Sequence, residues 1–439
     1  MIAEFKIKNF HSLQDEQTLS FIPTNDDTSR DIYTEEVADG VSLLKIGCIY
    51  GSNASGKTNI LKALDFFSRF MVDDNLNKGD EIGVVPFLLD DVSDKECTSF
   101  EMTFYLNRER YKLNLVLDKK VIYEETLQVY SSVQPTLLYK RTYNAEKDAT
   151  DIVFGGKLGL MKKSREVIVG NTINNQTVIA AFGKSNVEKS RLNMVYEFFS
   201  QRIAPIMYPQ SSLMGFTKRR LTRSKDGRLK KFILHFLKAS DFNISDIAIH
   251  DEEISITPEM ELMIKNTAGM PVKAKEEILK KGTLHSDEMF FVHNTSNGNK
   301  ELGEDLESRG TKRYMGLATV LYDLLVRGVI LPIDEIETSI HYELLSYFIK
   351  VFLVNSKRGA QLIVSTHDIN LLDEDYIRRD VIWFTDKSDG GETQLIRLSS
   401  LGLHKTLSVY NAYRQEKLVN LPFLDSIYMD MDEYYEAEE

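Results

Sequence analysis

The residues from Gly51 to Thr58 read Gly-Ser-Asn-Ala-Ser-Gly-Lys-Thr, which is the G-x-x-x-x-G-K-T pattern of a phosphate-binding loop. Glycines let backbone N–H groups approach phosphate oxygens closely. The lysine supplies a positive charge for the β- and γ-phosphates, and the threonine hydroxyl is a ligand for Mg2+. We therefore expect ATP to bind the central and final residues of this loop: Asn53, Ala54, Ser55, Gly56, Lys57 and Thr58.

The sequence on either side supports this interpretation of the loop. Residues 43–50 are apolar and strand-like, and residues 59–67 carry apolar side chains at helical spacing. A helix that starts at the loop would add its N-terminal dipole to phosphate binding. The alternative, an ordinary glycine turn, requires neither the strand nor the helix.

Two acidic residues follow a second apolar stretch. Residues 329–333 are expected to form a strand that ends in Asp334 and Glu335. Because side chains alternate along a strand, these two carboxylates should point in different directions. Asp334 can then hold Mg2+ together with Thr58, and Glu335 can orient or deprotonate the water that attacks the γ-phosphate. An apolar strand ending in Asp-Glu is common by itself, and the P-loop makes this one a Walker B candidate.

A histidine follows the next predicted strand, residues 361–365. Ligands collect at the carboxyl ends of parallel strands, so His367 is expected near the γ-phosphate as a sensor. Glu335 and His367 are therefore the candidate catalytic residues. The alternative for His367 is a structural histidine at a strand end.

Upstream of the acidic strand, Ser308 and Gly310 precede a predicted helix over residues 311–325. A helix N-terminus with a serine and a glycine can form a second phosphate cradle. Since the P-loop already serves the chain's own nucleotide, the second cradle suggests contact with ATP held by another copy. The alternative is a plain serine cap on the helix.

Residues 218–231 are strongly basic in a chain whose net charge is -12. Within them, Lys218, Arg219, Arg220 and Arg223 are a candidate contact for nucleic acid. A solvated helix face explains the same charges, and no aromatic residues are interleaved for base stacking. The overall acidity disfavours non-specific nucleic-acid binding by the rest of the surface.

Composition places the chain among ordinary globular proteins. Of its 439 residues 42% are hydrophobic and 27% are charged, and it has two cysteines, which disfavours a disulfide framework. No apolar run reaches the length of a membrane span, and residues 1–8 alternate like a strand rather than forming a signal peptide. We expect a cytoplasmic protein without membrane contact.

Coarse patterning predicts an α/β organisation in parts. Short strands precede the P-loop, an antiparallel β region extends through residues 99–160, and helices begin near residue 164, including one over residues 187–206. From residue 303 the pattern returns to alternating helix and strand. About seventy residues follow His367, so no nuclease domain is expected after the ATPase. The acidic residues 428–439 are expected to be a solvated tail.

The order of these motifs resembles the ABC class of ATPases, and within it the soluble branch of SMC heads, RecF and OLD-type ATPases. The residues that carry the resemblance lie at both ends of the chain: 5–12, 51–58, 86–87, 307–311, 333–341 and 365–368. The chain looks most similar to AAA-labelled ABC-type ATPases of bacterial anti-phage and abortive-infection systems. The resemblance implies a head with a mixed sheet, an antiparallel β subdomain and a mainly helical insertion.

The resemblance also implies an assembly and a division of the chain. ATP would lie between two copies, with Ser308 and Gly310 acting in trans and with Ser339 and His341 at the same interface. The ATPase domain would comprise residues 1–130 and 301–425, with an α+β insertion over 131–300 and a tail over 426–439. The chain would be an ATP-hydrolysing switch in a homodimer or higher oligomer, controlling a separate effector, a nuclease or toxin. The alternative is a RecF- or SMC-like DNA-repair ATPase.

Overall fold

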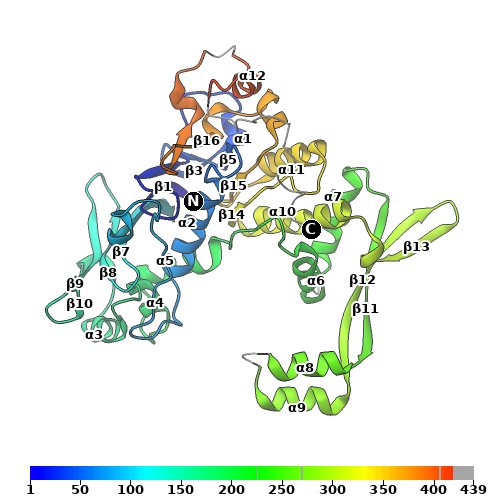
Figure 1. Ribbon diagram of the computed structural model, residues 1–439, viewed down its shortest axis with the longest axis horizontal. Helices are drawn as coiled ribbons and strands as arrows, with labels where there is room; N and C mark the ends of the chain where they lie inside the picture. Colours follow the sequence, from blue (N-terminus) through cyan, green and yellow to red (C-terminus); the bar gives the residue numbers. More distant parts are fainter. Residues whose placement is uncertain (225, 268–269, 405–406, 419–439) are drawn as a thin grey trace, which may run out of the picture. The chain divides into compact units, whose positions relative to one another are not determined.

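The computed structural model describes residues 1–224, 226–267, 270–404 and 407–418 (Figure 1). They form two compact units. Unit 1 comprises residues 1–208, 328–336 and the described residues from 359 onward, and unit 2 comprises residues 209–327 and 337–358. The predicted acidic tail over residues 426–439 lies outside the described residues. Both candidate carboxylates and the P-loop belong to unit 1.

The P-loop follows a strand at the centre of a five-stranded sheet in unit 1. All six residues of this strand, β5 (Ile46–Gly51), are buried, as its apolar sequence predicts. Its neighbours β15 and β16 run parallel to it, and β17 closes one edge in the antiparallel direction. The full order is β14 (Ile330–Ile333), β15 (Gln361–Ser365), β5, β16 (Ile382–Lys387) and β17 (Thr393–Arg397).

A second, seven-stranded antiparallel sheet in unit 1 confirms the predicted β region. Strands β6 and β7 alternate buried and more accessible residues, so one face carries an apolar core. The order is β10 (Ala149–Phe154), β9 (Thr136–Asn144), β8 (Ile122–Tyr130), β7 (Glu109–Leu117), β6 (Thr98–Leu106), β1 (Ile2–Lys8) and β2 (Gln17–Ser20). The sheet therefore runs without a break past residue 130. Together the two sheets confirm the predicted mixed α/β P-loop fold.

The helix after the P-loop, α2 (Lys57–Phe70), buries one apolar face. Its side chain Phe67 packs with Phe5 of β1 and Phe100 of β6 at ring-centroid distances of 5.4 Å each. Aromatic pairs at this distance add stability beyond the area they bury. The helix that starts at the P-loop is thus fixed to the antiparallel sheet by its far end.

The prediction of one helix over residues 187–206 is wrong at both ends, because residues 187–190 precede the helix and residues 203–206 follow its last turn. The α-helix α5 (Arg191–Glu197) continues as a π-helical turn over Phe198–Arg202 and then ends. Ile203 and Met207 instead pair in parallel with Ile330 and Ile333 of β14. Edge hydrogen bonds of β14 need partners, and this demand overrides the helical spacing.

The described part of unit 1 also contains five 3-10 helices and further short α-helices and strands. These α-helices and strands are α1 (Arg30–Tyr33), β3 (Thr34–Ala38), β4 (Val41–Leu44), α3 (Lys162–Asn171), α4 (Val178–Gly183) and α12 (Val409–Arg414).

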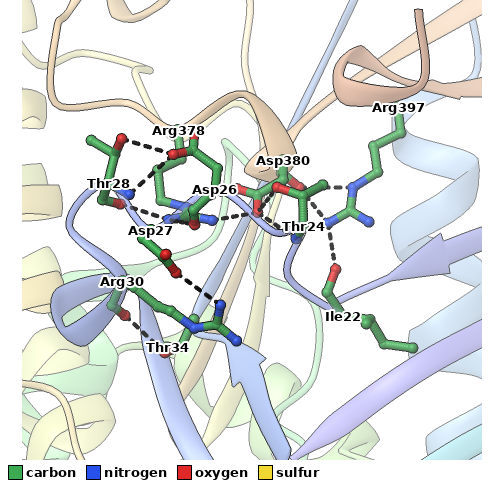
Figure 2. A network of polar contacts seen from close by, with 10 residues as sticks. All are labelled: Ile22, Thr24, Asp26, Asp27, Thr28, Arg30, Thr34, Arg378, Asp380 and Arg397. Atoms are coloured by element: carbon green, nitrogen blue, oxygen red, sulfur yellow. Dashed lines mark hydrogen bonds and ion pairs between the residues drawn. The ribbon is translucent and has the colours of Figure 1, made fainter. Parts of the chain in front are cut away.

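A buried ion pair fixes the loop after β2 to the chain just before β16 (Figure 2). Arg378 Nη2 lies 2.6 Å from Asp380 Oδ2, and both side chains are almost fully buried. Asp380 Oδ2 also accepts hydrogen bonds from the backbone and the hydroxyl of Thr24, while Arg378 donates to the carbonyls of Asp26 and Thr28. The irregular loop is therefore held by charge-assisted bonds instead of by secondary structure.

Unit 2 is mainly helical, with an antiparallel ribbon. Its helices include α10 (Arg309–Arg327), α6 (Leu213–Arg223), α7 (Arg228–Ala239) and α11 (Tyr342–Asn355), with α6 and α7 packed on α10. Strands β11 (Ile244–Ser255), β12 (Thr283–Thr295) and β13 (Gly298–Gly303) form a three-stranded sheet. Figure 1 shows the helices α8 (Pro258–Asn266) and α9 (Val272–Lys281) at the end of the β11–β12 ribbon.

Candidate nucleotide site

The two glycines of the P-loop are required by close packing. A Cβ on Gly51 would lie 2.3 Å from Thr385 Oγ1, and one on Gly56 would lie 2.1 Å from Thr393 Oγ1. Gly56 also has φ 102° as the residue that precedes α2, a conformation that side chains disfavour. The loop thus turns from β5 into the N-terminus of a 14-residue helix, which is the arrangement that binds phosphate.

The lysine of the loop lies along the loop itself. Lys57 Nζ donates hydrogen bonds of 2.9 Å to the carbonyls of Gly51 and Ser52, and the residue is only 5% exposed. Asn53 and Ala54 form the exposed tip of the turn. The positive charge is therefore held inside the loop that would surround a phosphate group.

Thr58 and Asp334 meet directly, although 276 positions separate them in sequence. The Thr58 hydroxyl lies 3.1 Å and 3.0 Å from the two carboxylate oxygens of Asp334 at the end of β14. Two neighbouring oxygens in an octahedral Mg2+ shell, each about 2.1 Å from the ion, lie about 3.0 Å apart. A hydroxyl and a carboxylate at this spacing fit a magnesium ion, and the role of Thr58 and Asp334 as its ligands stays a prediction.

Ser365, to which the sequence assigned no role, forms hydrogen bonds with both acidic residues. Ser365 ends β15, which lies between β5 and β14, and it is fully buried. Its hydroxyl donates to Asp334 Oδ1 at 2.5 Å and accepts the backbone N–H of Glu335 at 2.9 Å. One side chain thus fixes the carboxylate of Asp334 and the backbone of Glu335.

Glu335 and His367 lie at the same edge of the parallel sheet. His367 Nε2 is 4.0 Å from Glu335 Oε1, and the side chains are 35% and 44% exposed. Glu335 has a left-handed backbone with φ 46°, which is unfavourable for a residue with a Cβ. The turn directs a solvent-accessible carboxylate toward the histidine, next to the Thr58–Asp334 pair.

Within the described ranges, no group of three or more histidine, cysteine, aspartate or glutamate side chains could hold a metal ion. None of the helices in the same ranges combines the length and the apolar character needed to cross a membrane.

Comparison with known proteins identifies the family. Residues 46–373, about three quarters of the chain, match the family described as "AAA domain, putative AbiEii toxin, Type IV TA system". The chain belongs to this AAA family. The matched residues of the AAA domain include the P-loop, Asp334, Glu335 and His367. No curated protein matches the chain.

Solved structures similar to this AAA protein include two SMC heads. The SMC head domain from Thermotoga maritima is 13% identical, with a TM-score of 0.39, and the match covers 90% of this chain and 98% of that one. The SmcHead bound to the C-winged helix domain of ScpA is also 13% identical with a TM-score of 0.39, over 94% and 99% of the two chains.

The predicted trans elements of the AAA protein come together within unit 2. Ser308 Oγ accepts the N–H of Thr311 at 3.0 Å, so it caps α10, which is the alternative that the sequence left open. A Cβ on Gly310 would lie 3.2 Å from the carbonyl oxygen of Ser339. His341 caps α11 through Nδ1, which accepts the N–H of Glu343 at 3.3 Å. Contact with a second copy remains a prediction.

The predicted basic patch is partly neutralised within unit 2. Arg220 Nη2 lies 2.5 Å from Asp323 Oδ1, and Lys230 Nζ lies 2.7 Å from Asp246 Oδ1. Arg219 and Arg223 on α6 are exposed, and Lys218 is half-buried. The candidate nucleic-acid contact is therefore reduced from the predicted four residues to these three.

Proposed function

We propose that this AAA protein is an ATP-hydrolysing switch subunit of a bacterial anti-phage defence complex, in which a separate nuclease or toxin is the effector. The observation that carries the hydrolysis proposal is the junction of Thr58, Asp334 and Ser365 beside the accessible carboxylate of Glu335. A nucleotide-binding scaffold without turnover would not need that carboxylate at the end of β14.

The backbone N–H groups of the loop, with Lys57, would bind the β- and γ-phosphates of ATP. Thr58 and Asp334 would hold Mg2+, which offsets negative charge on the phosphates when bound. Glu335 would take a proton from a water molecule while the oxygen of that water attacks the γ-phosphorus. The bond from that phosphorus to the β,γ-bridging oxygen breaks, and Lys57 stabilises the charge that develops on ADP. His367, whose Nε2 lies 4.0 Å from Glu335 Oε1, would contact a γ-phosphate oxygen.

Efficient turnover would require a second copy of the chain. Ser308 and Gly310, at the N-terminus of α10, would bind the γ-phosphate of ATP held by the partner copy. Ser339 and His341 would lie at the same interface, because Ser339 adjoins Gly310 in unit 2. ATP binding would thus assemble the complex, and hydrolysis would release it.

The defence role has one specific support, which is the description of the matched family as "AAA domain, putative AbiEii toxin, Type IV TA system". The proposal predicts that protection of cells against phage requires turnover at this site. Lys57→Ala should abolish ATP binding, and Glu335→Gln should retain binding but lower the ATPase rate by about 10²–10⁴-fold.

Purified protein would be assayed for nucleotide binding and phosphate release, and cells for plaque formation. Lys62→Ala, on the same helix as Lys57, is the matched control and should behave like the wild-type protein. Full protection by Glu335→Gln with no phosphate release would contradict an ATPase switch, and absence of ATP binding by the wild-type protein would contradict the nucleotide site.

A DNA-repair ATPase is the second candidate, favoured by the basic side chains that α6 presents. It predicts ATPase activity that DNA stimulates and that loses this stimulation when Lys218, Arg219 and Arg223 are changed to alanine. Arg220 is omitted because it binds Asp323. An ATPase rate unchanged by DNA at low salt, where phosphate contacts are strongest, would exclude this candidate.

A further inference from the structure

A series of hydrogen-bonded hydroxyl groups lies against the P-loop, and these groups come from parts of the protein that are remote in sequence. Thr393, the first residue of β17, donates from Oγ1 to the carbonyl oxygen of Ser55 at 2.9 Å. Ser12, in the loop between β1 and β2, lies 2.7 Å from Thr393 Oγ1, and Asn59 of α2 donates to Ser12 Oγ at 2.7 Å. Ser12 and Thr393 both lie outside residues 46–373, the region matched by the AAA family.

The number of protons available decides which group donates and which accepts in each of these hydrogen bonds. A threonine hydroxyl has one proton, and the Ser55 carbonyl can only accept it. The Ser12 hydroxyl must therefore donate to Thr393 Oγ1 and accept the amide of Asn59. The backbone N–H of Thr393 also donates to the carbonyl oxygen of Ser12 at 2.7 Å, so the two residues are joined twice.

The bond to Ser55 determines how the loop presents its backbone. In a trans peptide the C=O and the following N–H point in opposite directions. Holding the Ser55 carbonyl against Thr393 therefore turns the N–H of Gly56 away from Thr393, as a phosphate cradle requires. Rotation of this peptide would place a carbonyl dipole where phosphate oxygens bind, which repels them.

The side chain of Ser55 is held by the same hairpin. Ser55 Oγ lies 2.6 Å from Thr385 Oγ1 on β16, and Thr385 Oγ1 donates to the carbonyl of Tyr50 at 3.2 Å. Thr393 lies so close to Gly56 that no side chain would fit at position 56. The β16–β17 hairpin thus holds both the main chain and the side chain of Ser55.

We propose that Ser12 and Thr393 are positioning residues for the nucleotide, which fix the Ser55–Gly56 peptide in the orientation that binds phosphate. This proposal rests on the proposed ATP site. It assigns a task in nucleotide binding to two segments that touch no reacting atom.

The test compares Thr393→Val, which keeps the shape and removes the hydroxyl, with Thr393→Ser, which keeps the hydroxyl. Thr393→Val and Ser12→Ala should each weaken ATP binding and raise KM by about tenfold, the usual effect of losing one hydrogen bond of this kind, with kcat changed less than about threefold. Thr393→Ser should restore binding to near the wild-type value. Gln394→Ala, an exposed neighbour on β17, is the matched control.

Titration calorimetry with ATP separates positioning from general damage. Damage to the fold lowers the melting temperature and the fraction of binding-competent molecules, but leaves the Kd of the competent molecules unchanged. Wild-type Kd in both Thr393→Val and Ser12→Ala would overturn the proposal. Ser12→Ala, on a partly exposed loop, decides the matter if Thr393→Val does not fold. A wild-type protein that fails to bind ATP would instead overturn the proposed function.

Discussion

At the scale of single residues, one buried hydroxyl organises the acidic end of β14. Ser365 Oγ bonds to Asp334 Oδ1 and to the N–H of Glu335, and the Ser365 carbonyl accepts the N–H of Ile336 at 3.2 Å. A left-handed conformation of a residue with a Cβ costs about 1–2 kcal/mol, and these bonds offset that cost at Glu335. The accessible position of the Glu335 carboxylate thus depends on Ser365.

Ser365→Ala should therefore lower kcat more than it weakens ATP binding. Loss of the hydroxyl removes the acceptor for the Glu335 N–H, and we expect kcat to fall by about tenfold to a hundredfold with Kd within about threefold. Steady-state ATPase assays and calorimetry give the two numbers. Ser356→Ala, which removes another buried serine hydroxyl, should leave both nearly unchanged. Equal kcat values for Ser365→Ala and the wild-type protein would show that turnover does not depend on the hydrogen bond from Glu335 to Ser365.

At the scale of elements, a buried ion pair joins the strands β8 and β9 to the segment before α4. Glu125 and Arg141 are fully buried, with Arg141 Nη1 lying 3.5 Å from Glu125 Oε2. Arg141 donates to the carbonyls of Asn174 and Gln176, and Glu125 accepts the N–H of Val178. Burial raises the pKa of the Glu125 carboxyl, although Arg141 acts to lower it.

Glu125→Ala should destabilise unit 1 by on the order of 3–5 kcal/mol, because it leaves the buried charge of Arg141 without its partner. Thermal unfolding followed by circular dichroism measures the loss. The double variant Glu125→Ala with Arg141→Met should recover much of the stability, since it removes the unpaired charge. If the single and double variants have the same melting temperature, the unpaired charge of Arg141 is not the cause of the lost stability.

A second prediction at this scale concerns how low pH affects the stability that the Arg378–Asp380 pair of Figure 2 provides. Burial acts to raise the pKa of the Asp380 carboxyl, but hydrogen bonds from Arg378 and Thr24 outweigh it and lower that pKa below the usual value. A carboxyl with a lowered pKa stabilises the fold above its unfolded pKa, about 3.9, and loses this contribution as pH falls through the folded value.

The difference in melting temperature between the wild-type protein and Asp380→Asn should therefore be constant above about pH 5 and shrink as the pH falls below about 4. Melting curves over a series of pH values test this expectation. Asp389→Asn, on the turn between β16 and β17, is the control and should show no such trend. A difference independent of pH would mean that the charge of Asp380 contributes nothing to stability.

At the scale of the whole molecule, the proposal requires two copies for each composite site. Lys57→Ala keeps an intact Ser308 turn, and Ser308→Arg keeps an intact P-loop. A mixture of the two variants should regain ATPase activity through one repaired site per dimer, up to about a quarter of the wild-type rate if subunits pair at random.

A mixture of Lys57→Ala with Glu335→Gln is the matched control. Both changes lie in the half of the site that unit 1 supplies, so no pairing repairs it and the mixture should stay inactive. Full activity of Ser308→Arg by itself would refute the contact in trans.

The sequence by itself determined the parts whose residues act through local spacing. The P-loop, the buried strand before it, the helix after it and the acidic strand end follow from motif and periodicity, because neighbouring residues set the turn, the strand and the helix. Only the tertiary structure decided what long-range pairing controls. The turn of residues 203–207 from helix to sheet depends on the free edge of β14, and the bonds of Ser365, Thr393 and Ser12 depend on strand order. Hydrogen bonds between residues hundreds of positions apart leave no periodic pattern in a single sequence, so the supports of the P-loop appear only when the chain is folded.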